Sequence, residues 1–207
     1  KQTYGEVRPG DIRYKDVNAD GKIDDDDVVP IAHSNVPQIQ YGFALEYRYK
    51  RWTISALFTG AAKVNFLYGG SGFYPFSGGE VGNILSIVND PKNRWTPAWY
   101  SGDPSTENPN ARFPRLTYGE NKNNNRASTF WLADGSYLRW KSLDISYRIG
   151  TNKALRTVGI SDMNLQFVGQ NLAVWDSVKL WDPGQASKNG AVYPLQRTFS
   201  LQLTATF

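Results

Sequence analysis

The sequence predicts an all-β protein: an antiparallel segment of a transmembrane β-barrel, with about five long strands and long extracellular loops. Two observations support this class. Several stretches alternate between apolar and polar residues over about 9–11 positions, the length of a tilted strand that crosses a bilayer. The connections between these stretches alternate between short and long, as they do in outer-membrane barrels.

The final stretch, residues 194–207, shows the alternation most clearly. Its apolar residues are Phe199, Leu201, Leu203, Ala205 and Phe207. Its interleaved polar residues are Thr198, Ser200, Gln202, Thr204 and Thr206. A period of two gives a strand one apolar and one polar face, which suits lipid on one side and a wet lumen on the other. The sequence ends on an aromatic residue, an ending typical of a barrel strand.

Residues 38–62 predict a long β-hairpin. Residues 38–49 and 52–62 both alternate, and Lys50-Arg51 forms a tight polar break between them. Aromatic residues gather near the turn. Each strand is longer than the usual globular strand of about 5–6 residues.

Residues 137–207 predict the last three strands of the chain. Alternation appears over 137–149, restarts over 163–175 and returns in the final stretch. The sequence between the first two of these strands, 151–158, predicts a short helix in a turn.

Residues 63–136 show almost no alternation and predict a long extracellular loop. The stretch is rich in glycine, proline and asparagine, and loops of this length are usually functional. Its aromatic residues suggest a ligand-binding surface. The candidates for it are Trp95, Trp99, Tyr100 and Trp131. The alternative is that these aromatic side chains pack the loop together.

The order of loop lengths predicts an orientation in the membrane. From the first long strand, the connections hold 2, about 74, about 13 and about 18 residues. Barrels have short periplasmic turns and longer extracellular loops. We therefore expect the C-terminus in the periplasm, and residues 1–37, 63–136 and 176–193 outside the cell.

Residues 16–27 have the spacing of an EF-hand-type calcium loop within the extracellular segment 1–37. Oxygen-bearing side chains occupy loop positions 1, 3 and 5, and Gly21 occupies position 6, where a sharp turn is needed. The candidate Ca²⁺ ligands are Asp16, Asn18, Asp20, the backbone carbonyl of Lys22, Asp24 and Asp27. Aspartate replaces the usual glutamate at position 12. The alternative is a solvated acidic turn.

Composition excludes several classes of protein. The chain has no cysteine, so it has no disulfide framework and no thiolate metal site. Its net charge is +4, and the basic residues are scattered, which does not favour a nucleic-acid partner. The single histidine, His33, has no second histidine or cysteine for a zinc site. No catalytic constellation stands out, and we expect no enzyme activity.

Four motifs carry a resemblance to a known family. They are GDIRYKDVNADGKID at 10–24, YLRWKSLDISYRI at 137–149, VGQNLAVW at 168–175 and YPLQRTFSLQLTATF at 193–207. In this order they resemble the C-terminal part of SusC/RagA-type TonB-dependent outer-membrane transporters of Bacteroidetes. The resemblance implies a barrel of about 22 strands, plugged by an N-terminal domain.

The resemblance also implies the function and the partners. It implies active import of oligosaccharides or peptides, with a SusD-like surface lipoprotein as lid and energy from the TonB complex. Five strands cannot close such a barrel, so we expect the plug and upstream strands of the same barrel as partners. The alternative is a soluble, calcium-stabilised β-sandwich that binds glycans. It explains the calcium loop and the aromatic residues but not the long apolar faces.

Overall fold

The computed structural model describes residues 1–77 and 82–207, which form two compact units. The sheet unit comprises Ser34–Asn65, Asp134–Ala186 and Val192–Phe207. The loop unit comprises Lys1–His33, Phe66–Ala133 and Ser187–Ala191.

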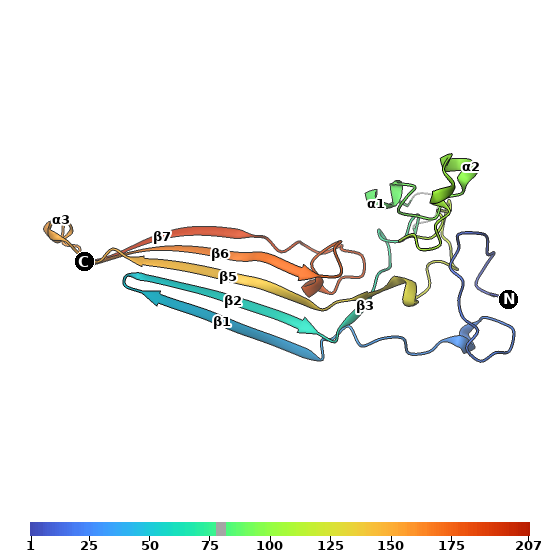
Figure 1. Ribbon diagram of the computed structural model, residues 1–207, viewed down its shortest axis with the longest axis horizontal. Coiled ribbons are helices and arrows are strands. Elements are labelled where there is room, and N and C mark those ends of the chain that lie inside the picture. The colour runs from blue at the N-terminus through green and yellow to red at the C-terminus, as the bar shows by residue number, and fades with distance from the viewer. Residues whose placement is uncertain (78–81) are drawn as a thin grey trace. The chain divides into compact units, whose positions relative to one another are not determined.

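The sheet unit contains one antiparallel sheet with the strand order β1-β2-β5-β6-β7 (Figure 1). Its strands are β1 (Ile39–Tyr49), β2 (Trp52–Ala62), β5 (Tyr137–Arg148), β6 (Asp162–Asp176) and β7 (Thr198–Thr206). The predicted all-β antiparallel class is confirmed. The strand bounds lie close to the alternating stretches, except that β7 begins four residues after Pro194.

The remaining elements are short. The strands β3 (Asn65–Leu67) and β4 (Leu132–Asp134) pair with each other. The α-helices are α1 (Ser86–Asn89), α2 (Ala98–Ser101) and α3 (Lys153–Thr157). The 3₁₀ helices are η1 (Asp25–Asp27), η3 (Pro104–Thr106), η4 (Thr129–Trp131) and η5 (Pro183–Gln185). Within residues 1–77 and 82–207, no helix has both the length and the apolar character needed to cross a membrane.

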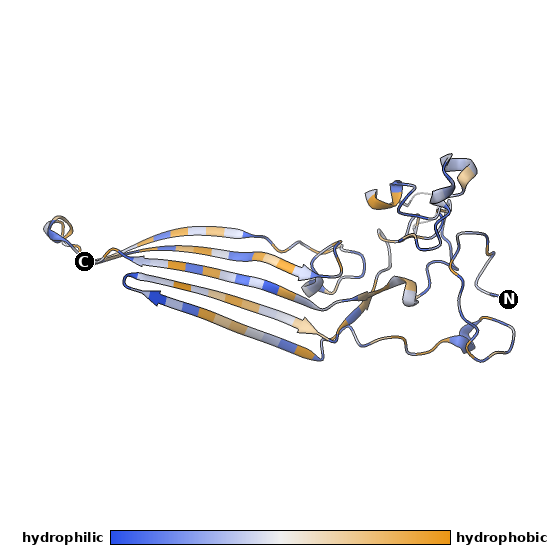
Figure 2. Cartoon of the chain, viewed as in Figure 1, coloured by the Kyte–Doolittle hydropathy of each residue, from blue (hydrophilic) through white to orange (hydrophobic). Residues whose placement is uncertain are grey.

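The register of the sheet gathers the apolar side chains of all five strands on one face. Ile54 pairs with Ile145, which pairs in turn with Phe167, and Phe167 pairs with Leu201. Directly paired residues point to the same side of a sheet, so these residues form a row across four strands. Figure 2 shows the hydropathy alternating along the strands. The adjacent row, from Ser55 through Asp144 and Val168 to Ser200, lies on the opposite, mostly polar face.

The apolar face is open to the surroundings. Leu45 and Leu203 are each 61% exposed, and Leu201 is 72% exposed. A β-sandwich would bury this face against a second sheet. The only other sheet in the described residues has two strands of three residues each. The exposure therefore argues against the β-sandwich alternative.

A β-bulge in β5 keeps the apolar face continuous. Leu138 and Trp140 stand at even-numbered positions and Leu143 and Ile145 at odd-numbered ones. A regular strand would place the two pairs on opposite faces, yet all four residues lie on the apolar face. This is possible because Trp140 and Ser142 pair with the consecutive residues Phe58 and Leu57 of β2, which leaves Lys141 as an extra residue in β5. The Trp140 ring stacks on Phe58 at 5.7 Å, and its Nε1 donates to the Ser142 carbonyl at 3.0 Å.

Contacts of Tyr41 with Gly60 and Tyr137 connect three strands on the apolar face. The two residues pair across β1 and β2, and the Tyr41 ring covers Gly60. The Tyr41 hydroxyl donates to the carbonyl of Tyr137 in β5 at 2.9 Å. A Cβ at position 60 would lie 2.4 Å from both the ring and this carbonyl oxygen. Glycine is therefore required at this position.

The short connections lie at one end of the sheet. These are the turn at Lys50-Arg51 and the α3 connection, which ends at Ser161. The chain terminus lies at the same end, where the Ser161 backbone N–H donates to the Thr206 carbonyl at 2.7 Å. The long connections 63–136 and 177–197 leave from the other end. This separation of short and long connections follows from the antiparallel strand order.

Replacing Gly60 with alanine should destabilise the sheet. The added methyl would collide with a backbone carbonyl that cannot move away without breaking strand pairing, at a cost of about 1–3 kcal/mol. Gly42→Ala is the control, because its Cβ would lie 3.4 Å from the nearest atom, an ordinary contact. Urea titration of the protein folded in detergent micelles measures both. Equal stability of the two variants would contradict the tight Tyr41–Gly60 contact.

Candidate functional site

The core of the loop unit is aromatic. Phe73, Phe113 and Trp131 are 1%, 1% and 2% exposed. The Trp131 ring meets Phe73 edge to face at 5.6 Å, and its Nε1 donates to the Asn124 carbonyl at 2.7 Å. Trp131 is one of the four predicted ligand-binding residues. Its burial favours, for this residue, the packing role given above as the alternative.

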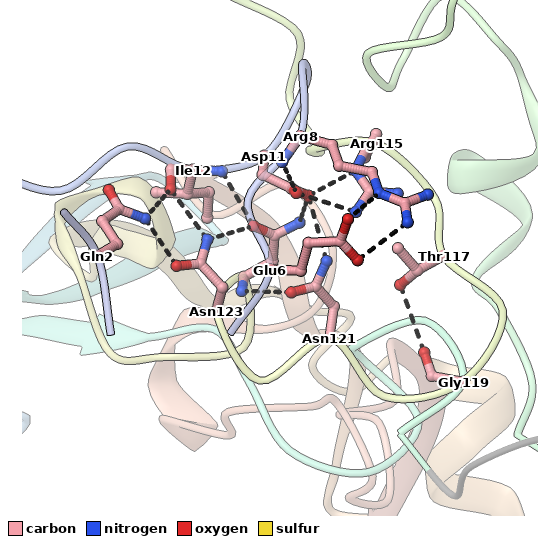
Figure 3. A network of polar contacts seen from close by, with 11 residues as sticks. Gln2, Glu6, Arg8, Asp11, Ile12, Arg115, Thr117, Gly119, Asn121 and Asn123 are labelled. Carbon is pink, nitrogen blue, oxygen red and sulfur yellow. Dashed lines mark hydrogen bonds and ion pairs between the residues drawn. The ribbon is translucent and has the colours of Figure 1, made fainter. Parts of the chain in front are cut away.

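Asp11 is the centre of a buried polar network in the loop unit (Figure 3). Its side chain is fully buried and lies 2.8 Å from Arg115 Nε. Arg115 Nη2 also donates to Asp11 Oδ2 at 2.9 Å. Asn124 Nδ2 and Asn121 Nδ2 donate to Asp11 Oδ1 at 2.8 and 3.2 Å, and the Arg8 backbone N–H donates to Oδ2 at 2.8 Å. Both carboxylate oxygens are thus well supplied with donors.

Two buried asparagines extend this network to the N-terminal segment. Asn124 Oδ1 accepts from the Ile12 backbone N–H at 2.9 Å, and Asn123 Nδ2 donates to the Ile12 carbonyl at 3.0 Å. Gln2 Nε2 donates to Asn123 Oδ1 at 2.8 Å. The Tyr14 hydroxyl donates to the Asn123 carbonyl at 2.6 Å, and burial raises the pKa of Tyr14 to about 12. The hydroxyl therefore keeps its proton at neutral pH.

Three of the predicted ligand-binding residues line one groove on the loop unit. We call it the aromatic compartment; its volume is about 400 Å³. It is lined by Phe76, Arg94, Trp95, Thr96, Pro97, Trp99, Tyr100, Arg115, Leu116, Thr117 and Tyr118. Trp99, Tyr100 and Tyr118 are 84%, 67% and 74% exposed. Aromatic rings with free faces can stack on sugar rings or on apolar side chains.

Local structure fixes the aromatic side chains of this compartment. Gly10 has a φ of 86° and lies beneath the Trp95 ring, and a Cβ there would come within 2.2 Å of Trp95 Cε3. Trp99 and Tyr100 lie on α2, whose first backbone N–H, that of Ala98, donates to Glu107 Oε1 at 2.8 Å. The sequence gives no signal for the contact between Gly10 and Trp95, because these residues are far apart in the chain.

The predicted calcium loop forms a compact turn held by backbone N–H donors. The Gly21 N–H donates to Asp16 Oδ2 at 2.9 Å, and Gly21 has a φ of 86°. The Val17 N–H donates to Asp27 Oδ1 at 2.6 Å. This hydrogen bond is the main cause of the lowered pKa of Asp27. Asn18, Asp20 and Asp24 each accept from a backbone N–H two residues later, that of Asp20, Lys22 and Asp26.

The loop fits a hard cation only in part. Asp16 Oδ1 is enclosed yet has no hydrogen-bond partner, as an oxygen reserved for a cation would be. The chemistry of the donor set is that of a Ca²⁺ site. However, among the described residues no three acidic, histidine or cysteine side chains gather around one point. The Asp27 carboxylate does not gather with other carboxylates, and its oxygens accept hydrogen bonds from backbone N–H groups.

Arg126 links the calcium loop to the rest of the loop unit. Its guanidinium lies 3.6 Å from the centre of the Tyr4 ring and 2.6 Å from Asp25 Oδ1. The Tyr4 ring in turn meets Tyr14 edge to face at 5.9 Å. These contacts join the loop at 16–27 to the segment that carries the polar network.

Replacing Asp11 with alanine should open the loop unit. Removing one partner of a buried ion pair leaves Arg115 and two asparagines unsatisfied, at a cost of about 3–5 kcal/mol. Glu6→Ala is the control, since Glu6 pairs with Arg8 at an exposed position, where solvent screens the ion pair and it contributes little to stability. Hydrogen exchange measured by mass spectrometry should increase over 115–131 in the first variant only. Unchanged exchange in both would contradict the role of Asp11.

Comparisons with known proteins identify relatives over nearly the whole chain. The chain is 27% identical over 210 residues to TonB-dependent receptor P26 of Formosa agariphila, covering 96% of this chain and 20% of that protein. It is 24% identical over 217 residues to TonB-dependent receptor P3 of the same organism, covering 98% of this chain. The chain thus spans about a fifth of the length of these relatives. No family model matches it.

Solved structures share the fold. The RagAB peptide importer in its open-open state aligns with a TM-score of 0.60 at 21% identity, covering 86% of this chain and 18% of that one. A structure of the RagAB peptide transporter aligns with a TM-score of 0.61 at 21% identity, covering 84% and 18%. The resemblance predicted from the four sequence motifs, to the C-terminal part of SusC/RagA-type TonB-dependent outer-membrane transporters, is thereby confirmed.

Proposed function

We propose that the chain forms part of the barrel wall and the extracellular loops of an outer-membrane, TonB-dependent importer. One observation carries this proposal: the strand register gathers the apolar side chains of five strands on a single open face. Lipid is the partner that such a face requires, because soluble proteins rarely expose so large an apolar patch. The opposite face, with its Ser, Thr, Gln, Asp and Arg side chains, lines the lumen.

The end of the sheet with the short connections faces the periplasm. Barrels of this kind have short periplasmic turns, and the chain terminus at Phe207 lies at that end. Tyr47, Tyr49, Trp52 and Tyr147 gather there on the apolar face, with Trp52 and Tyr147 in contact at 4.6 Å. Such aromatic side chains form the girdles of membrane barrels at the lipid headgroups. The loop unit is then extracellular.

The partners follow from the free edges of the sheet. β1 and β7 are edge strands, and in lipid their unpaired backbone groups must bond to other strands. These strands, and the plug, belong to the remainder of the same barrel. As the resemblance implies, a SusD-like surface lipoprotein forms the lid and the TonB complex supplies the energy.

The cargo is an oligosaccharide or a peptide that contacts the extracellular loops on its way in. Trp95, Trp99 and Tyr100 in the aromatic compartment are the residues that receive it. The exposure of Trp99 and Tyr100 supports this role, because it leaves their rings open to contact by a ligand.

Replacing Leu203 with arginine tests the wall and the import function together. Leu203 faces lipid, and a charge there should cost about 2–4 kcal/mol and lower the amount of receptor assembled in the outer membrane. Nutrient uptake should fall in proportion. Gln202→Arg is the matched control, because its side chain faces the lumen and should leave assembly unchanged. Equal effects of the two substitutions would contradict the assignment of faces.

Ca²⁺ bound at Asp16, Asn18, Asp20, Asp24, Asp27 and the Lys22 carbonyl would order the extracellular loop at 16–27. Two observations support this site: Asp16 Oδ1 has no hydrogen-bond partner, and the lowered pKa of Asp27 keeps that carboxylate ionised at neutral pH. The ion would compete with the backbone donors that now hold Asp27 and draw the carboxylates together.

Removing two of these carboxylates should abolish calcium retention. The double variant Asp16→Asn and Asp20→Asn loses two of the charged ligands, whereas Asp26→Asn, at a position with no assigned ligand, should keep the ion. Elemental analysis of the purified receptor measures the calcium content. Equal calcium in the double variant and the parent protein would exclude the site.

A further inference from the structure

Four positive charges without a carboxylate partner lie at the end of the sheet that carries the short connections (Figure 1). They belong to Lys50 and Arg51 in the β1–β2 turn and to Lys153 and Arg156 on α3. In the part of the chain that the structure describes, none of the four forms an ion pair. The other arginines at this end are paired: Arg48 lies 2.7 Å from Glu46, and Arg148 lies 3.2 Å from Asp162.

The two turn residues adjoin aromatic side chains of the apolar face. Tyr49 pairs with Trp52, and Trp52 pairs with Tyr147, so these three residues form one row across β1, β2 and β5. We call this row the aromatic rim. Tyr49 and Trp52 are 53% and 45% exposed. The connection 149–161, which carries α3, contains no aromatic residue. Only the turn therefore combines free cations with aromatic rings.

Contacts of their own hold both turn side chains near the aromatic rim. Lys50 Nζ lies 5.2 Å from the centre of the Tyr49 ring, within the range of a cation–π interaction. Arg51 Nη1 donates to the Ile149 carbonyl at 2.8 Å, and the Arg51 carbonyl accepts from the Arg148 N–H at 2.9 Å. One ammonium and one guanidinium thus lie at either side of β2, at the edge of the apolar face.

We propose that Lys50, Arg51 and the aromatic rim bind an anionic phospholipid, phosphatidylglycerol, in the periplasmic leaflet. The acyl chains cover the apolar face, and Tyr49 and Trp52 lie at the level where aromatic side chains meet lipid headgroups. The lipid phosphate accepts from the Lys50 ammonium and from the guanidinium N–H groups of Arg51 that do not bond to Ile149.

Charge selects the anionic headgroup over a zwitterionic one. Phosphatidylethanolamine carries its own ammonium beside the phosphate, and that ammonium would lie next to two cations of the turn. Phosphatidylglycerol carries only the negative charge. The inference rests on the membrane position and orientation proposed above, and it adds a lipid partner that the import function by itself does not require.

Site-specific photo-crosslinking tests this lipid site. The full receptor that contains this chain is placed in nanodiscs of equimolar phosphatidylglycerol and phosphatidylethanolamine. The photoreactive residue p-benzoyl-phenylalanine replaces either Tyr47, beside the aromatic rim, or Leu201, in the same row of the apolar face but on β7. Mass spectrometry measures the ratio of the two lipid adducts. The ratio of phosphatidylglycerol to phosphatidylethanolamine at position 47 should exceed that at position 201 about fivefold or more, the factor that one cation near the headgroups contributes.

Charge variants locate the contact. Lys50→Gln combined with Arg51→Gln should lower the adduct ratio at position 47 to that at position 201. Lys153→Gln combined with Arg156→Gln is the matched control. It removes the same charge from the same end of the sheet and should leave the ratio at position 47 unchanged. Loss of folded receptor would lower both adducts together, so the ratio reports the lipid preference alone.

Three results would overturn the lipid site: equal ratios at positions 47 and 201 in the parent receptor, an unchanged ratio in the Lys50 and Arg51 variant, or an equal decrease in the control variant. The last result would indicate a general attraction of the basic end of the sheet for anionic lipid. Absence of any lipid adduct at both positions would instead refute the barrel wall itself, and with it the proposed function.

Discussion

The alignment of apolar side chains across the sheet is the constraint on which the rest of the structure depends. A strand shows alternate side chains to opposite faces, so a slip of one residue in any pairing would turn its apolar set to the polar side. β5 illustrates the force of this constraint. Trp140 stands at an even position and Leu143 at an odd one, and β5 has one extra residue in its pairing with β2, so that both side chains stay on the apolar face.

The loop unit is stabilised by other interactions, mainly buried hydrogen bonds and ion pairs. Its aromatic core is small, and the N-terminal segment is attached to the rest of the unit through amides and two ion pairs, Asp11–Arg115 and Asp25–Arg126. Burying Asp11 is costly unless its charge is compensated, and here the Arg115 guanidinium and three N–H donors, from Asn121, Asn124 and the Arg8 backbone, surround the two oxygens. Such a network defines one arrangement of the segments that form it, because each member depends on the geometry of the others.

The sheet could be predicted from the sequence because its signal is local. A period of two is visible within ten residues, and the long strands were located from it alone. The loop unit could not be predicted in the same way. Asp11 and Asn124 are 113 positions apart, and nothing in either neighbourhood indicates their contact. The tryptophans show the same limit of local sequence. Trp99 is exposed, whereas Trp131 is buried against Phe73 and Phe113, which are distant from it in the sequence.

The candidate site depends on a short stretch of the N-terminal segment. Gly10 leaves room for the Trp95 ring and accepts from the Arg115 backbone, Asp11 anchors the Arg115 side chain, and Asp16 begins the predicted calcium loop. The same stretch therefore supports the aromatic compartment and begins the predicted calcium loop. Apart from α2, the lining segments 95–97 and 115–118 have no helix or strand to hold them, so they depend on the contacts that Gly10 and Asp11 make. The GDIRYKD motif, which carried part of the family resemblance, is in physical terms the support of the aromatic compartment.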